Sequence, residues 1–173
     1  MDALEMLKGR RAVRKYKSAP VDDAALEKVL EAGTYAPTGC GTQGFRIVVV
    51  QDPATLKTLK TLNASIMGKG PETDPYYGAP VILLVLTAPE AVTGIWDGSA
   101  VCTNLANAAY AVGLSTCWIH RCKEMFETAE GKALLKKWGL DENCSGVASL
   151  ALGYADGENK EAPARKPGLI VRI

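Results

Sequence analysis

The sequence has no apolar stretch long enough to cross a bilayer. Its longest apolar runs, such as residues 79–88, fall well short of the roughly 20 residues that a membrane-spanning helix needs. The first residues also lack the apolar core of a signal peptide, because Glu5 and Lys8 interrupt it. The sequence therefore predicts a cytoplasmic protein that makes no membrane contact.

The chain also lacks the patterns of several common cysteine, zinc and phosphate sites. The five cysteines include no Cys-x-x-Cys pair, which argues against thioredoxin-like chemistry, and their odd number argues against a disulfide scaffold. With one histidine, His120, a zinc site would need thiolates at irregular spacings, so we predict no metal site and mostly buried, apolar cysteines. Neither Gly-x-Gly-x-x-Gly after a strand nor Gly-x-x-x-x-Gly-Lys-Ser/Thr occurs, so the Rossmann and P-loop phosphate sites are absent.

The charge balance leaves little room for a broad basic surface. Lysine and arginine total 20 against 19 aspartates and glutamates, which gives a net charge of +1. Binding to nucleic acid or to an anionic membrane surface usually needs a clear basic excess, so neither partner is predicted. With 173 residues, 47% of them apolar, the chain is predicted to fold as one domain over residues 1–173.

Against this balanced background, three arginines gather within five residues near the N-terminus. Arg10, Arg11 and Arg14 lie in the run Arg-Arg-Ala-Val-Arg, and no acidic residue occurs between Glu5 and Asp22. Guanidinium groups are permanently charged and present planar donors that suit phosphate or carboxylate. The run therefore has two interpretations, a solvent-facing basic turn or a phosphate clamp.

Hydrophobic periodicity predicts helices and strands in mixed order. Helical spacing marks residues 2–9, a helix capped by Asp22 or Asp23, a helix from Pro53, a buried alanine-rich helix over 97–113 and one amphipathic helix over 124–138. Apolar and β-branched runs predict strands at 45–51, 81–86, 115–119, 146–154 and 169–173. This order is typical of the α+β class or of a three-layer α/β/α sandwich. The last strand would pair with its own sheet or with that of a partner.

A turn-rich segment lies between the second helix and the first strand. Residues 37–44 read Pro-Thr-Gly-Cys-Gly-Thr-Gln-Gly, with three glycines and one proline. Such a segment lets the backbone approach a ligand closely, and its small polar groups would suit a planar ring. An ordinary connection between a helix and a strand explains the composition equally well.

Several short motifs occur in order along nearly the whole chain. They are Gly-Arg-Arg-Ala-Val-Arg-Lys-Tyr (9–16), Ala-Pro-Thr-Gly (36–39) followed by Gln43, Gly-Ala-Pro (78–80), Asn104 in the alanine-rich helix, Gly-Leu-Ser-Thr-Cys-Trp-Ile (113–119), Leu-Gly-Tyr (152–154), and Arg165 with Lys166. No single motif is specific, but their order and spacing together resemble the flavin-dependent nitroreductase family. The family versions include Arg-Arg-Ser-x-Arg-x-Phe/Tyr, Ala-Pro-Ser and Gly-Leu-Gly-Ser-Cys-Trp-Ile.

The resemblance implies an α+β, nitroreductase-like three-layer α/β/α sandwich with a mostly antiparallel central sheet, assembled as an intertwined homodimer with FMN at the subunit interface. It implies an enzyme that passes hydride from NADH or NADPH through flavin N5 to a nitroaromatic, quinone or related acceptor, with ping-pong kinetics. The chemistry would occur on the flavin, so no separate catalytic residue is predicted. The alternatives are a non-catalytic FMN-binding homodimer, for storage or sensing, and a flavin-free structural dimer.

At the phosphate end, the resemblance implies a cluster of cations from both ends of the chain. Arg10, Arg11 and Arg165 would contact the FMN phosphate, with Lys166 close by. Ala12 also falls in this region, where the family usually has a serine, and its hydroxyl is therefore missing. A phosphate with nearly two negative charges suits such clustered guanidinium groups.

Around the isoalloxazine ring, the resemblance implies a second set of residues. They are Pro37, Thr38 and Gly39 from the other subunit, Gln43, and the backbone N–H groups around Ile119, His120 and Arg121. Arg14 would lie near N1 and O2, where its charge would stabilise the reduced ring, and Asn63 would approach the ring as well. His120 and Arg121 stand where smaller or acidic residues are more frequent, which would narrow the acceptor pocket or favour an anionic substrate. Trp118 is predicted to pack in the interior.

Overall fold

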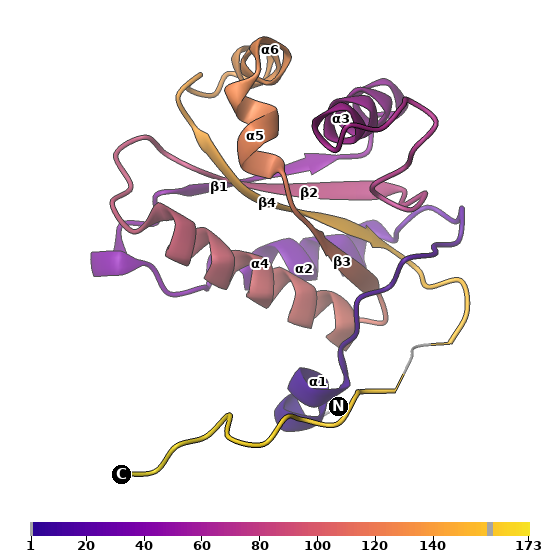
Figure 1. Ribbon diagram of the computed structural model, residues 1–173, viewed down its shortest axis with the longest axis vertical. Helices are drawn as coiled ribbons and strands as arrows, with labels where there is room; N and C mark the ends of the chain where they lie inside the picture. Colours follow the sequence, from indigo (N-terminus) through magenta and orange to yellow (C-terminus); the bar gives the residue numbers. More distant parts are fainter. Residues whose placement is uncertain (1, 159–160) are drawn as a thin grey trace.

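The computed structural model describes residues 2–158 and 161–173, and its centre is an antiparallel sheet (Figure 1). The four strands lie in the order β1-β2-β4-β3. Their bounds are Phe45–Val50 (β1), Val81–Thr87 (β2), Ser115–Ile119 (β3) and Ser145–Gly153 (β4). All seven residues of β2 are buried, as its continuous apolar run predicted, because helices cover both of its faces.

Helices on the two faces of the sheet complete the predicted three layers (Figure 1). One face carries α2 (Asp23–Thr34) and α4 (Gly94–Ala111), and the other carries α3 (Pro53–Ile66), α5 (Cys122–Glu127) and α6 (Ala129–Lys137). Successive residues of β2 alternate between these layers, because side chains along a strand point to opposite faces. Leu83 packs with Leu105 of α4, and Leu84 packs with Leu59 of α3. The three-layer fold class is therefore confirmed.

Helix starts follow the local signals in the sequence. Asp22 Oδ2 accepts a hydrogen bond from the Ala25 N–H (2.9 Å) at the start of α2. Asp52 Oδ2 accepts one from the Thr55 N–H (2.8 Å), and Pro53 occupies the first turn of α3. Both caps satisfy N–H groups that a helix leaves free. A short helix α1 (Ala3–Gly9) opens the chain, as predicted. Among the residues described, none of the helices combines the length and the apolar character that crossing a bilayer requires.

The prediction of one amphipathic helix over 124–138 is wrong, because Thr128 divides it into α5 and α6. Thr128 adopts an extended conformation with φ −75° and ψ 158°. Its Oγ1 donates to the Met125 carbonyl (2.7 Å) and accepts from the Gly131 N–H (3.0 Å), so one hydroxyl ends α5 and caps α6. The apolar spacing continues across this break, and periodicity alone therefore could not reveal it.

The predicted C-terminal strand at 169–173 is not formed within the chain. Residues 161–173 contain neither helix nor strand, and they run past α1 and away from the sheet (Figure 1). Their large apolar side chains are exposed: Leu169, Ile170, Val171 and Ile173. Pairing of this segment with the sheet of its own chain is therefore wrong. Pairing with the sheet of a partner stays a prediction.

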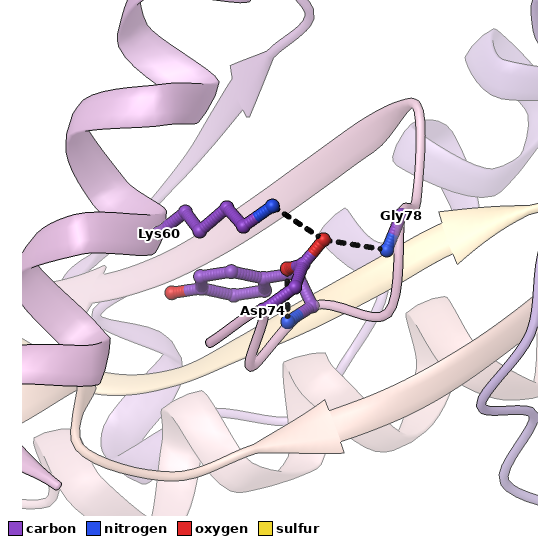
Figure 2. A network of polar contacts seen from close by, with 4 residues as sticks. Lys60, Asp74 and Gly78 are labelled. Atoms are coloured by element: carbon purple, nitrogen blue, oxygen red, sulfur yellow. Dashed lines mark hydrogen bonds and ion pairs between the residues drawn. The ribbon is translucent and has the colours of Figure 1, made fainter. Parts of the chain in front are cut away.

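The irregular connection from α3 to β2 is fastened by one carboxylate (Figure 2). Asp74 Oδ2 forms an ion pair with Lys60 Nζ of α3 (2.9 Å) and accepts from the Gly78 N–H (2.9 Å). Asp74 Oδ1 accepts from the Tyr76 N–H (2.9 Å). The connection is thereby held against α3 with the Tyr76 side chain buried beneath it.

Candidate functional site

The arginine run lies alongside β3, at the edge of the sheet. Ala12 forms a parallel bridge with Thr116, and the Val13 N–H donates to the Thr116 carbonyl (3.0 Å). Burial raises the pKa of the Cys117 thiol, and the positive charges of Arg14 and Arg10 partly oppose that rise. Both guanidinium groups therefore lie near the strand that leads into the predicted ring-side turn.

The Arg11 guanidinium forms some of its hydrogen bonds within the chain. Its Nη1 donates to the carbonyls of Lys8 and Arg10 (2.7 Å each), which complements the negative end of α1. Its Nε is buried and has no partner among the described residues. A buried donor without a partner is costly, so this atom suits an added acceptor such as an anion.

The glycine-rich segment is a strained turn fixed to the start of α4. A 3-10 turn covers Gly39–Gly41, and Cys40 and Gln43 adopt positive φ values of 52° and 50°. The Gly39 N–H donates to Oδ1 of the buried Asp97 (3.0 Å). Non-glycine residues adopt positive φ only at a cost, and the bond to Asp97 helps to hold the turn in this conformation. The turn borders a cavity of about 410 Å³ lined by Gly39, Cys40, Thr42, Gly44 and residues 90–93.

Within one chain, the arginine run and the glycine-rich segment lie toward opposite ends of α4. The segment bonds to Asp97 in the first turn of that helix, whereas Gly9, next to the run, packs against Tyr110 near its end. Thirteen residues at about 1.5 Å each separate these points by about 20 Å along the helix. The structure therefore does not bring Pro37, Thr38, Gly39 or Gln43 to the arginine run of the same chain.

The turn after β3 is held by a buried asparagine of α3. Ile119 is buried, His120 is exposed, and Arg121 adopts a left-handed conformation with φ 74°. Arg121 Nε donates to Asn63 Oδ1 (2.8 Å), and Asn63 Nδ2 donates to the His120 carbonyl (3.2 Å). Asn63 is 0% exposed, so its amide faces this turn and not an open surface.

Trp118 does not pack in the interior. Its side chain is 36% exposed, and its ring lies 6.4 Å from that of His120, measured between centroids. Trp118 is the exposed residue of β3, whereas Thr116, on the same face of the strand, is 2% exposed. The prediction of a buried Trp118 is wrong. The apolar character of the segment could not distinguish the two faces of the strand.

The cations near the C-terminus lie on the exposed tail. Arg165 donates through Nε and Nη2 to the carbonyl of Pro163, at 3.2 and 2.6 Å. Lys166 is exposed as well. Both bonds lie within the tail and do not fix its position against the arginine run. The prediction that both ends of one chain meet at the phosphate therefore depends on how the tail docks.

One of the five cysteines is expected to react with a thiol reagent in the native protein, and the other four are not. Cys40 is exposed, whereas Cys102, Cys117, Cys122 and Cys144 are buried. Burial raises the pKa of the Cys122 thiol to about 12, so little reactive thiolate forms near neutral pH. A disulfide-exchange reagent should modify one thiol in the native protein and five in denaturant. Rapid native modification of two or more thiols would contradict the burial of this set.

Comparison with known proteins identifies the family. The model of the Nitroreductase family matches residues 7–154. A Methanothermobacter thermautotrophicus protein named "Putative NADH dehydrogenase/NAD(P)H nitroreductase" is 27% identical over 176 residues, covering 97% of this chain and 81% of the relative. An Archaeoglobus fulgidus protein of the same name is 27% identical over 161 residues, covering 91% and 87%.

Solved structures agree with this assignment. A Bacteroides fragilis nitroreductase with bound FMN superposes with a TM-score of 0.90 at 26% identity, covering 100% of this chain and 99% of the other. A Desulfitobacterium hafniense nitroreductase with bound FMN reaches 0.87 at 22% identity, covering 100% and 99%, and supports the fold alone. The resemblance read from the motifs is thus confirmed: the chain belongs to the nitroreductase family.

Proposed function

We propose that the protein is an FMN-dependent oxidoreductase that uses NADH or NADPH to reduce a small acceptor, such as a nitroaromatic or a quinone. Membership of the nitroreductase family supports this reaction class, as does the likeness to an FMN-bound nitroreductase over the whole chain. The observation in this chain that carries the proposal is the arginine run bridged to β3, with a buried Arg11 donor that has no partner among the described residues.

The donor set at this run fits the phosphate of FMN. Arg10 and Arg11 supply permanent positive charge at the end of α1, and Arg11 Nε is an unused, desolvated donor. A phosphate with nearly two negative charges would satisfy that donor and neutralise both cations. Arg165 and Lys166 would join this cluster once the tail docks. Ala12 adds no hydroxyl, so the guanidinium groups carry the recognition.

The ring would then lie along the end of β3 and the turn that follows it. FMN supplies the hydride chemistry when bound, and the chain orients the ring. Arg14 would place a cation near N1 and O2, where negative charge collects on reduction, and the N–H groups around Ile119, His120 and Arg121 would face the opposite edge. This arrangement is electrostatic preorganisation, and it requires no proton-transferring side chain for the hydride step.

We infer that the functional unit is a homodimer of this single domain. The glycine-rich segment and the arginine run lie about 20 Å apart along α4. A second copy would bring Pro37, Thr38 and Gly39 to the ring, with Gln43 as a further contact. The exposed apolar side chains of the tail supply a surface for such an exchange.

The decisive experiment is a visible spectrum of the purified protein, followed by chromatography of the released chromophore. Bound FMN that NADH or NADPH bleaches, and that a nitroaromatic or a quinone reoxidises, would support the proposal. FMN that neither nicotinamide reduces would indicate a storage or sensing role. A colourless protein that takes up no added FMN would reject both.

Replacing Arg14 by alanine is expected to lower the midpoint potential of the bound flavin. The reduced ring would lose a nearby cation worth about 1.4 kcal/mol, which corresponds to about 30 mV for a two-electron couple. Equilibration with a reference dye measures the change. Arg46→Ala removes an exposed arginine on β1, at the opposite edge of the sheet, and should leave the potential unchanged. An unchanged potential in Arg14→Ala would remove Arg14 from this role.

A further inference from the structure

The buried amide of Asn63 is wholly engaged in the polar interior between α3, β4 and the turn after β3. Its Oδ1 accepts from Arg121 Nε (2.8 Å), and its Nδ2 lies within hydrogen-bond distance of the His120 carbonyl and of the Tyr76 hydroxyl (3.2 Å each). Asn63 is 0% exposed and Tyr76 is 2% exposed. One side chain thus bonds to two consecutive residues of the turn, once through a backbone atom and once through a side chain.

The turn needs such a restraint because Arg121 has an unfavourable backbone conformation. Its φ of 74° and ψ of 10° lie in the left-handed region, which glycine adopts freely and other residues adopt at a cost. Such a conformation persists only where its surroundings determine it. The two bonds from Asn63 act on the carbonyl before Arg121 and on the guanidinium of Arg121 itself.

Asn63 is itself firmly held. The Tyr76 hydroxyl lies 3.3 Å from Ser149 Oγ of β4, and burial raises the pKa of Tyr76 to about 12, so the hydroxyl stays protonated near neutral pH. Asp74, two residues before Tyr76, forms an ion pair with Lys60 (Figure 2). Lys60 lies about one helical turn before Asn63 in α3. Asn63 therefore links the turn after β3 to α3 and, through Tyr76 and Ser149, to β4.

We propose that Asn63 is a positioning residue for the flavin, acting through the His120–Arg121 turn and not by contact with the ring. The inference rests on the proposed function, in which the N–H groups of this turn face the flavin. A hydrogen-bond donor supports a cofactor only when it is aimed correctly, and a misplacement of about 1 Å can reduce a rate roughly a hundredfold. Asn63 keeps the N–H groups of the turn correctly oriented by holding Arg121 in its left-handed backbone conformation.

The test combines Asn63→Ala with Arg121→Gly in a double-mutant cycle. Glycine adopts the left-handed conformation without help and removes the guanidinium that Asn63 holds. Asn63→Ala alone should weaken FMN binding roughly tenfold to a hundredfold, within the range of coupling between residues that share one hydrogen-bond network. In the Arg121→Gly background, the same change should cost less than about threefold, because positions that act through one another are not additive. Equal losses in both backgrounds, or no loss in either, would overturn the proposal.

Further variants control for folding and for general loss of an asparagine. Asn104→Ala removes a helical asparagine whose Nδ2 also donates to a backbone carbonyl, that of Ala32 (3.2 Å), and it should retain FMN affinity per binding site. If Asn63→Ala does not fold, Asn63→Asp carries the test, because it keeps the acceptor for Arg121 and loses the donor to His120. It should show a measurable loss of affinity of less than about tenfold, below the range expected for Asn63→Ala. Wild-type affinity in this variant would count against the proposal.

A readout without flavin separates this inference from the proposed function. Amide hydrogen exchange at His120 and Arg121 in the apoprotein should accelerate in Asn63→Ala and not in Asn104→Ala. If the unmodified protein takes up no FMN, the proposed function fails and with it the flavin role of Asn63, whatever the exchange rates. If it binds FMN and exchange is unchanged in Asn63→Ala, the positioning role alone fails.

Discussion

Replacing Arg10 by alanine is expected to weaken FMN binding by about 1.5–3 kcal/mol, as for the loss of a charged hydrogen bond. This corresponds to roughly a tenfold to a hundredfold rise in Kd. Arg10 follows α1 directly, and its N–H caps that helix through the Met6 carbonyl (3.1 Å). Alanine keeps this backbone bond and removes only the guanidinium. Titration of the apoprotein with FMN, followed by quenching of flavin fluorescence, measures the effect.

Two controls distinguish a phosphate contact from a general loss of charge. Arg46→Ala removes one positive charge from β1, on the opposite edge of the sheet from β3, and should bind FMN as the unmodified protein does. Arg10→Lys keeps the charge but not the planar fork, so its affinity should be intermediate. If Arg10→Ala binds FMN as tightly as the unmodified protein, the run is a solvent-facing basic turn and not a clamp.

Deleting residues 161–173 is expected to convert the proposed dimer into a monomer and to cause a larger loss of FMN affinity than Arg10→Ala. The deletion removes Arg165, Lys166 and the four exposed apolar side chains of the tail. Burying one such side chain contributes about 1.5–3 kcal/mol to the free energy of association. The conformational entropy lost when the tail becomes ordered offsets much of the total from the four side chains. A net loss of about 3 kcal/mol or more would raise the dimer dissociation constant at least a hundredfold. Sedimentation velocity over a range of concentrations measures the change.

A second variant separates the charges of the tail from its apolar contacts. The double substitution Arg165→Ala and Lys166→Ala keeps residues 161–173 in place. It should bind FMN weakly and remain dimeric, because the apolar part of the tail is unchanged. A truncated protein that is still a dimer with full FMN affinity would show that the tail has neither role. Unchanged affinity in the double variant would remove only the two cations from the site.

The features that depend on neighbours in the chain could be predicted from sequence. A continuous apolar run indicated that β2 is buried on both faces, and it lies between β1 and β4. Asp22 and Asp52 marked two helix starts, because an N-cap bonds to N–H groups a few residues further on. The ordered motifs identified the family, since their spacing spans nearly the whole chain.

Other features depend on contacts between residues far apart in the chain. Trp118 is exposed on the edge strand β3, although the apolar pattern around it indicated burial. Arg121 is left-handed, and its side chain bonds to Asn63, 58 residues earlier in the chain. Arg11 Nη1 turns back to the carbonyls at the end of α1 and Nε stays without a partner among the described residues, a division that its sequence position does not reveal.

The sequence by itself determined the mixed helix-and-strand order and the run of arginines, because caps and periodicity are local properties, and its ordered motifs indicated the family and with it the three layers. Tertiary structure alone decided which of these cations keep an unused donor, how the turn after β3 is restrained, and that the glycine-rich segment lies far from the arginines of its own chain. Those outcomes follow from packing of α3 and α4 against the sheet. Burial and hydrogen bonding between distant residues set such geometry, and no pattern along the chain encodes it visibly.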